Sequence, residues 1–107
     1  MTENHENLFD DDGYPTEKSL DRIANWNFND VNECFNFIYS LWEYPNYYQA
    51  EETVNDFGDN IVRISLSTGG WSGNEDIIEA LQKNTIIWIT TWQSSRRGGH
   101  YVFEIRK

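Results

Sequence analysis

The first half of the chain has the apolar spacing of helices. Over about 31–43 the apolar side chains recur at i, i+3, i+4, i+7 and i+8, namely Cys34, Phe37, Ile38, Leu41 and Trp42. This stripe predicts a helix packed on a core, with Cys34 as a small buried apolar group and not a nucleophile. A shorter helix is predicted over about 16–25, where Thr16 is a suitable N-cap residue.

The second half alternates between apolar and polar positions, which is typical of strands. Segments 61–67 and 100–106 each place their apolar residues on one face. Segment 85–92 is apolar on both faces, and this pattern predicts a central strand. Segment 47–54 is a weaker candidate for an edge strand, because two acidic residues interrupt it.

A third helix is predicted over about 73–83, opened by Ser72-x-x-Glu75 as a capping box. The strands on either side of 94–100 predict an antiparallel hairpin. Together the elements predict an α+β fold. In it, two N-terminal helices and one later helix pack on one face of a three- to four-stranded, mostly antiparallel sheet.

The length of 107 residues suits one domain. Residues 1–12 hold five acidic residues and no basic one, which predicts a flexible acidic tail before a single domain at 13–107. Only 38% of the residues are hydrophobic, but five Trp, six Tyr and six Phe are among them, and each aromatic ring buries a large area. A homo-oligomer would help to stabilise so modest a core.

Charge is distributed unevenly along the chain. Residues 1–60 carry 14 acidic and two basic residues, whereas 61–107 carry four acidic and six basic ones, for a net charge of −10. The acidic half would repel phosphates, so we expect no direct binding to nucleic acid. The second half could still hold a small anion through its arginines, which are Arg63, Arg96, Arg97 and Arg106.

No catalytic, metal or cofactor motif emerges from the sequence. Cys34 is the one cysteine, which excludes an internal disulfide and fits a reducing cytosol. No ligand spacing suits zinc, and neither a phosphate-binding P-loop nor a dinucleotide fingerprint is present. His100 and Glu104 lie roughly 13 Å apart by strand rise, and no third group orients a serine with His100. We therefore expect a non-enzymatic protein without a metal or cofactor, and no apolar run long enough to span a membrane.

Two glycine-rich stretches, 68–75 and 94–100, are the candidate binding site. Glycine permits positive φ and close approach to the main chain, arginine forks hold phosphate or carboxylate, and an aromatic ring can stack on a nucleobase. The alternative is that both are plain turns: a strand-to-helix turn whose Trp covers the core, and a hairpin tip with solvated charges. The predicted ligand-binding residues are Gly69, Gly70, Trp71, Ser72, Arg96, Arg97, His100 and Tyr101.

The motifs TGGWSGNE at 68–75 and SSRRGGHY at 94–101, with Ile78 and Leu81 between them, resemble a signature shared by small proteins of tailed phages and prophages. The similarity extends back to Tyr14 and covers most of the chain beyond the acidic tail. It implies expression in the cytoplasm of a bacterial host and, by analogy with other accessory phage proteins, a role against host defence. It brings no activity, cofactor or catalytic residue.

Two functions remain open on the sequence. The first is a non-enzymatic binding protein that holds a small anionic, nucleotide-like ligand, which requires the two glycine-rich stretches to converge. The second is an acidic protein–protein inhibitor, or nucleic-acid mimic, that docks on a host defence protein. This second function requires one carboxylate surface built from Glu33, Glu43, Glu51, Glu52, Asp56 and Asp59.

Overall fold

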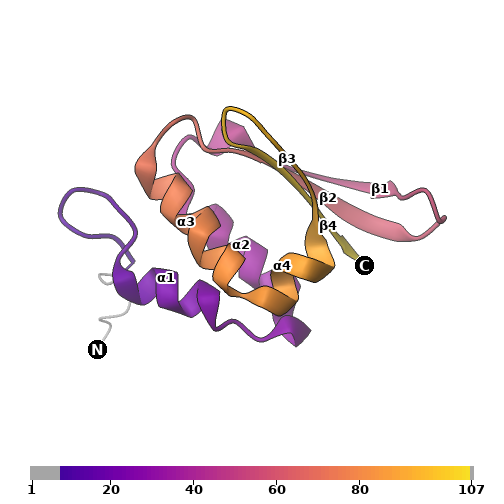
Figure 1. The fold of residues 1–107 in the computed structure, drawn as a ribbon, viewed down its shortest axis with the longest axis horizontal. Helices are drawn as coiled ribbons and strands as arrows, with labels where there is room; N and C mark the ends of the chain where they lie inside the picture. The colour runs from indigo at the N-terminus through magenta and orange to yellow at the C-terminus, as the bar shows by residue number, and fades with distance from the viewer. Residues whose placement is uncertain (1–7, 107) are drawn as a thin grey trace.

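The structure, a computed structural model, describes residues 8–106. In this part of the chain, helices lie on one side of a four-stranded antiparallel sheet, which confirms the predicted α+β class (Figure 1). The helices are α1 (Glu17–Ala24), α2 (Val31–Leu41), α3 (Ser72–Lys83) and α4 (Thr85–Thr91), and single 3-10 turns, η2 (Phe28–Asp30) and η3 (Pro45–Tyr47), precede α2 and β1. The strands are β1 (Tyr48–Val54), β2 (Asn60–Ser67), β3 (Trp92–Arg96) and β4 (His100–Arg106).

The strand order is β1-β2-β4-β3, and every pairing is antiparallel. β1 is an edge strand, as predicted for segment 47–54. The hairpin predicted around the second glycine-rich stretch is also confirmed, because β3 pairs directly with β4. The central positions belong to β2 and β4, whose register aligns Ile64 with Phe103 and Ser67 with His100.

Segment 85–92 is helix α4 for most of its length, so the predicted central strand is wrong. The buried Asn84 fixes the start of this helix. Its side chain accepts a hydrogen bond from the Ile87 amide at 3.3 Å and donates to the carbonyl oxygens of Ile23 and Trp26, both at 3.0 Å. Tertiary contacts of this kind outweigh the β propensity of a segment rich in Ile and Thr.

The buried and exposed apolar residues of α4 lie on opposite sides of the helix. Ile87 and Thr91, four positions apart, are buried on one side. Ile86 and Ile89 are 61% and 71% exposed on the other. The face of the predicted strand that contains Ile87 and Ile89 therefore mixes buried and exposed residues, because the buried positions follow the period of a helix.

The core lies between the helices and the sheet. α2 buries Cys34 and Ile38 as the apolar stripe predicted, but Phe35 is buried where Phe37 was expected. The Phe35 and Phe103 rings lie 5.3 Å apart and join this helix to the centre of the sheet. Burial raises the pKa of the Cys34 thiol to about 12, which agrees with its predicted role as a buried apolar group.

The two predicted helix caps have different outcomes. Thr16 caps α1 as predicted, because its Oγ1 accepts a hydrogen bond from the Ser19 amide at 3.2 Å. The predicted capping box of α3 is wrong: its N-cap residue is Trp71, which makes no side-chain cap bond. Ser72 Oγ instead hydrogen-bonds the Tyr14 hydroxyl at 3.5 Å.

Of the predicted acidic tail at 1–12, residues 1–7 lie outside the described residues. Residues 8–12 belong to a turn before α1. The turn is closed by an isolated antiparallel bridge between Phe9 and Pro15. Asp10 Oδ1 accepts hydrogen bonds from the amides of Asp12 and Tyr14, both at 2.9 Å. This turn places Tyr14 beside the start of α3.

Candidate functional site

The two glycine-rich stretches meet at one end of the sheet. β2 ends at Ser67 and β4 begins at His100, and these two residues are cross-strand partners. Beyond them, the Thr68 amide donates a hydrogen bond to the Gly99 carbonyl at 3.0 Å. The predicted convergence of the stretches is therefore confirmed, and Figure 1 shows both connections at the end of the sheet opposite the β1–β2 turn.

A third segment, between α2 and β1, completes this end of the sheet. The buried Asn74 of α3 donates hydrogen bonds to the carbonyl oxygens of Glu43 and Thr68, at 3.0 and 3.2 Å, and accepts one from the Glu43 amide at 3.0 Å. The Trp42 indole donates to the Ser67 carbonyl at 3.2 Å. We call the three segments 42–47, 67–71 and 96–100 together the loop rim.

Glycine is required where the segments of the loop rim touch. Gly69 and Gly99 have φ of 65° and 79°, a region that other residues rarely adopt. A Cβ at Gly99 would overlap Thr68 Oγ1, and one at Gly69 would lie 2.9 Å from Cε2 of Tyr47. These two glycines therefore permit both the backbone conformation and the close packing of the rim.

Two of the predicted binding residues carry exposed positive charge on the rim. Arg96 ends β3 and Arg97 follows it, and neither makes an ion pair with another described residue. His100, the cross-strand partner of Arg96, has its Nδ1 2.6 Å from Ser67 Oγ. The hydrogen bond to Ser67 orients the ring and leaves Nε2 as the nitrogen that a ligand could use.

Three other predicted binding residues make contacts within the fold. The Trp71 ring stacks on Tyr14, with centroids 5.0 Å apart, and its six-membered ring covers Gly73. Ser72 contacts the same tyrosine. Tyr101 is paired with Leu66 on the helix-covered face, and its ring lies 6.3 Å from that of Trp88. The rim thus brings together Gly69, Gly70, Arg96, Arg97 and His100, whereas Trp71, Ser72 and Tyr101 take part in packing.

Tyr44 and Tyr47 are rim residues that the sequence analysis missed. Their side chains are 45% and 46% exposed, and the ring centroids lie 5.6 Å apart. Tyr44 has φ of 63°, a conformation that is unfavourable for a tyrosine. The sequence Tyr44-Pro45-Asn46-Tyr47 could have indicated an aromatic loop, but its proline was interpreted only as the end of a helix.

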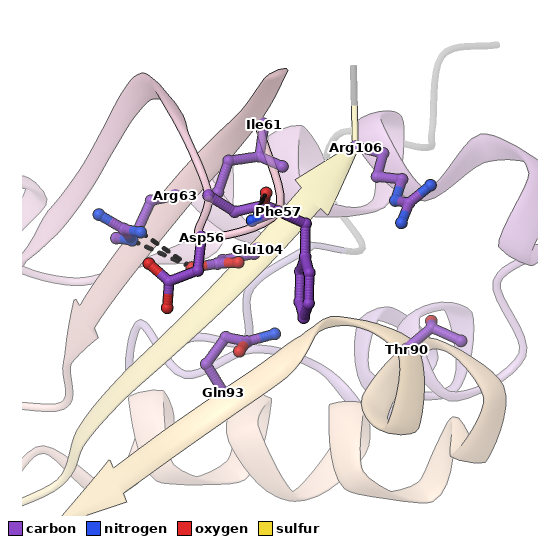
Figure 2. Close-up of a pocket in the computed structure, with 9 residues that line it drawn as sticks. Asp56, Phe57, Ile61, Arg63, Thr90, Gln93, Glu104 and Arg106 are labelled. Carbon is purple, nitrogen blue, oxygen red and sulfur yellow. Dashed lines mark hydrogen bonds and ion pairs between the residues drawn. The ribbon is translucent and has the colours of Figure 1, made fainter. Parts of the chain in front are cut away.

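A hollow lies at the opposite end of the sheet, near the β1–β2 turn. It has a volume of about 280 Å³, and Phe57 projects across it from the turn (Figure 2). Both arginines that line it are ion-paired. Arg63 donates to Glu104 Oε2 from Nε and Nη2, at 3.2 and 3.0 Å, and Arg106 lies 3.1 Å from Asp59. We call this region the hairpin end.

The rim offers little for covalent or metal chemistry. Ser67 and His100 form a hydrogen-bonded pair, but the nearest carboxylate on the same face of β4, Glu104, is held by Arg63. Nucleophile activation requires a base that is itself oriented by a third group, and no described residue takes that part here. Among residues 8–106, no three His, Cys, Asp or Glu side chains are grouped as metal ligands would be.

The carboxylates required by the inhibitor hypothesis are dispersed. Glu51 and Glu52 are neighbours on β1, so their side chains point to opposite faces of the sheet. Asp59 is ion-paired with Arg106, and Glu51 is the cross-strand partner of Arg63. Glu51 and Glu52 therefore do not share one face of the sheet, and the charge of Asp59 is paired.

No protein-family model matches the chain, and no curated protein or solved structure matches it significantly. In the described part of the chain, no helix has both the length and the apolar character needed to cross a membrane.

Proposed function

We propose that this protein is a non-enzymatic binding protein that holds a small anionic, nucleotide-like ligand at the loop rim. The observation that carries the proposal is the pair Arg96 and Arg97, exposed and without an ion-pair partner among the described residues, on a hairpin that touches a glycine-rich loop. Guanidinium groups bind phosphate and carboxylate through two parallel hydrogen bonds. His100, oriented by Ser67, supplies a further nitrogen beside them.

The resemblance to phage proteins supports a role for this binding in a bacterial host. Expressed in the cytoplasm of a bacterial host, a protein of this kind would sequester a nucleotide that the host uses as a defence signal. This role needs tight binding without turnover, which agrees with a rim that has cationic groups and no activated nucleophile. The competing inhibitor function has less support, because its carboxylates are dispersed or paired.

A thermal-shift screen with nucleotides, cyclic nucleotides and inorganic triphosphate tests this proposal. A ligand present at 100 times its Kd should stabilise the protein by about 2.7 kcal/mol. Arg97→Ala should weaken binding of the positive compound by about 1.5–3 kcal/mol, measured by calorimetry, because a charge-assisted contact is lost. Lys83→Ala is the matched control, since it removes one exposed positive charge from the end of α3, outside the rim.

Two results would contradict the proposed function. One is that no anion in the screen shifts the melting temperature. The other is that the double variant Arg96→Ala/Arg97→Ala binds the positive compound as tightly as the unmodified protein. If the acidic variant Glu51→Gln/Glu52→Gln instead abolishes capture of a host protein while Arg97→Ala has no effect, the inhibitor function holds.

A further inference from the structure

The tyrosine pair of the loop rim, Tyr44 and Tyr47, is more exposed than its packing on Gly69 requires. Tyr44 and Tyr47 present roughly half of their side chains to solvent. Their positions are nevertheless fixed: Glu43 is held through both its amide and its carbonyl by Asn74, and Tyr47 packs on Gly69. Unfavourable backbone conformations such as that of Tyr44 cluster at ligand-binding positions, where the surrounding structure holds them in place.

The tyrosine pair and the arginines belong to segments that contact one another. Tyr47 contacts Gly69, the adjacent Thr68 contacts Gly99, and the hairpin that contains Gly99 carries Arg96 and Arg97. Neighbouring strands lie about 4.8 Å apart, so β1, where the tyrosines enter the sheet, is about 14 Å from β3, where the arginines leave it. A ligand that reaches both must be extended.

The two ends of the loop rim differ in chemistry. The tyrosine end offers aromatic rings beside the exposed carboxylate side chain of Glu43, which would repel a phosphate. The arginine end offers positive charge. A neutral planar ring is therefore favoured at Tyr44 and Tyr47, and a phosphate chain at Arg96 and Arg97.

We propose that the ligand is a nucleoside polyphosphate whose base stacks on the ring of Tyr47, beside Tyr44, while its phosphates bind Arg96 and Arg97. This inference rests on the proposed function and adds a subsite to it. It assigns base stacking to the tyrosine pair and not to Trp71, because Trp71, although partly exposed, stacks on Tyr14 and covers Gly73.

The test compares ATP with inorganic triphosphate, which has the phosphates and lacks the base. In calorimetry on the unmodified protein, ATP should bind about 5- to 150-fold more tightly than triphosphate, the range that one stacked base contributes. Tyr47→Ala should reduce ATP binding to the triphosphate level and leave triphosphate binding unchanged. Tyr47→Phe should keep the preference for ATP, because the ring remains. Phe57→Ala, which removes an 88% exposed ring at the hairpin end, is the control and should change neither affinity.

The outcomes separate the subsite from the proposed function. Equal binding of ATP and triphosphate by the unmodified protein, or an unchanged ATP preference in Tyr47→Ala, would overturn the tyrosine subsite while the anion site stands. Weakening of both compounds by Arg97→Ala is expected if the phosphates bind there. If neither compound binds the unmodified protein at millimolar concentration, the assignment of a nucleoside polyphosphate is wrong, and the anion site is then decided by the wider screen of nucleotides and cyclic nucleotides. The melting temperatures of the ligand-free variants establish that each one is folded.

Discussion

The two ends of the sheet carry arginines in opposite states. At the hairpin end, Arg63 and Arg106 are ion-paired with Glu104 and Asp59. At the loop rim, Arg96 and Arg97 make no ion pair with another described residue. Charges that are already paired contribute to the fold and have less to offer a ligand, whereas unpaired charges keep their full hydrogen-bonding capacity.

The two ends of the sheet also differ in how closely other atoms approach the glycines of their turns. Gly58 of the hairpin turn has φ of 85°, but a Cβ there would meet nothing within 4 Å. Gly99 of the rim has a similar φ of 79°, and a Cβ there would overlap Thr68 Oγ1. The turn at the hairpin end needs glycine for conformation alone, while the rim also needs it for close packing. The rim is therefore the more tightly constrained of the two ends.

Alanine substitution of these two glycines gives the largest expected contrast. Gly99→Ala should destabilise the protein by about 2–5 kcal/mol, because a left-handed conformation costs about 1–2 kcal/mol and overpacking about 1–3 kcal/mol. Gly58→Ala should cost about 1–2 kcal/mol, since only the conformational term applies. Urea denaturation of both variants measures the difference. Equal losses would mean that the rim yields to the extra methyl group and is no more constrained than the hairpin turn.

Two asparagines give the next contrast. Asn74→Ala removes three hydrogen bonds from a fully buried site and should destabilise the protein by about 2–3 kcal/mol, because buried backbone groups lose their partners. Asn55 Oδ1 accepts two hydrogen bonds, from the amides of Phe57 and Asp59, in the more exposed hairpin turn. Asn55→Ala should cost about 0.5–1.5 kcal/mol, because water can replace its bonds. A larger loss of stability in Asn55→Ala than in Asn74→Ala would show that the hydrogen bonds of Asn74 do not hold the rim together.

The sequence predicted the fold class well where the apolar period was unambiguous. The α2 stripe, the alternation of β2 and β4 and the hairpin all follow from periodicity and turn residues. Segment 85–92 was mispredicted because its helix depends on Asn84, whose partners lie about 60 residues away in the chain, at Ile23 and Trp26. A single buried side chain with distant partners leaves no periodic signal.

The site was predicted in part for a similar reason. Glycine and arginine signal their roles through residue type, so both loops and their convergence were accessible from the sequence. The position of an aromatic ring is set by contacts distant in sequence: Trp71 stacks on Tyr14, and Asn74 holds the segment that carries Tyr44. The sequence therefore predicted that the two loops meet, but it did not predict that Trp71 stacks on Tyr14 or that Tyr44 and Tyr47 lie at the same rim.

Alkaline pH tests the core that lies beneath both ends. Burial raises the pKa of Cys34 from 9.0 to about 12 and that of Tyr48 above its usual value near 10. Between pH 9 and 12 the unfolded chain therefore binds fewer protons than the folded one, so the free energy of unfolding should fall as pH rises. The urea midpoint measured at pH 7, 9 and 10.5 follows this loss, and Cys34→Ala should reduce its slope. Because this core is common to both ends, Gly99→Ala and Gly58→Ala should show the same pH dependence, and unequal slopes would contradict a shared core.

The smallest contrast concerns the arginines themselves in the absence of ligand. Arg106→Ala breaks an ion pair whose side chains are 78% and 40% exposed, and it should cost no more than about 1 kcal/mol. Arg97→Ala breaks no ion pair among the described residues and should change stability by less than about 0.5 kcal/mol. Urea denaturation in low and high salt measures both, and only the loss in Arg106→Ala should shrink as salt screens the pair. A stability loss in Arg97→Ala that matches or exceeds that of Arg106→Ala would show that Arg97 supports the fold. Its exposed charge could then no longer be taken as a sign that the rim is built for a ligand.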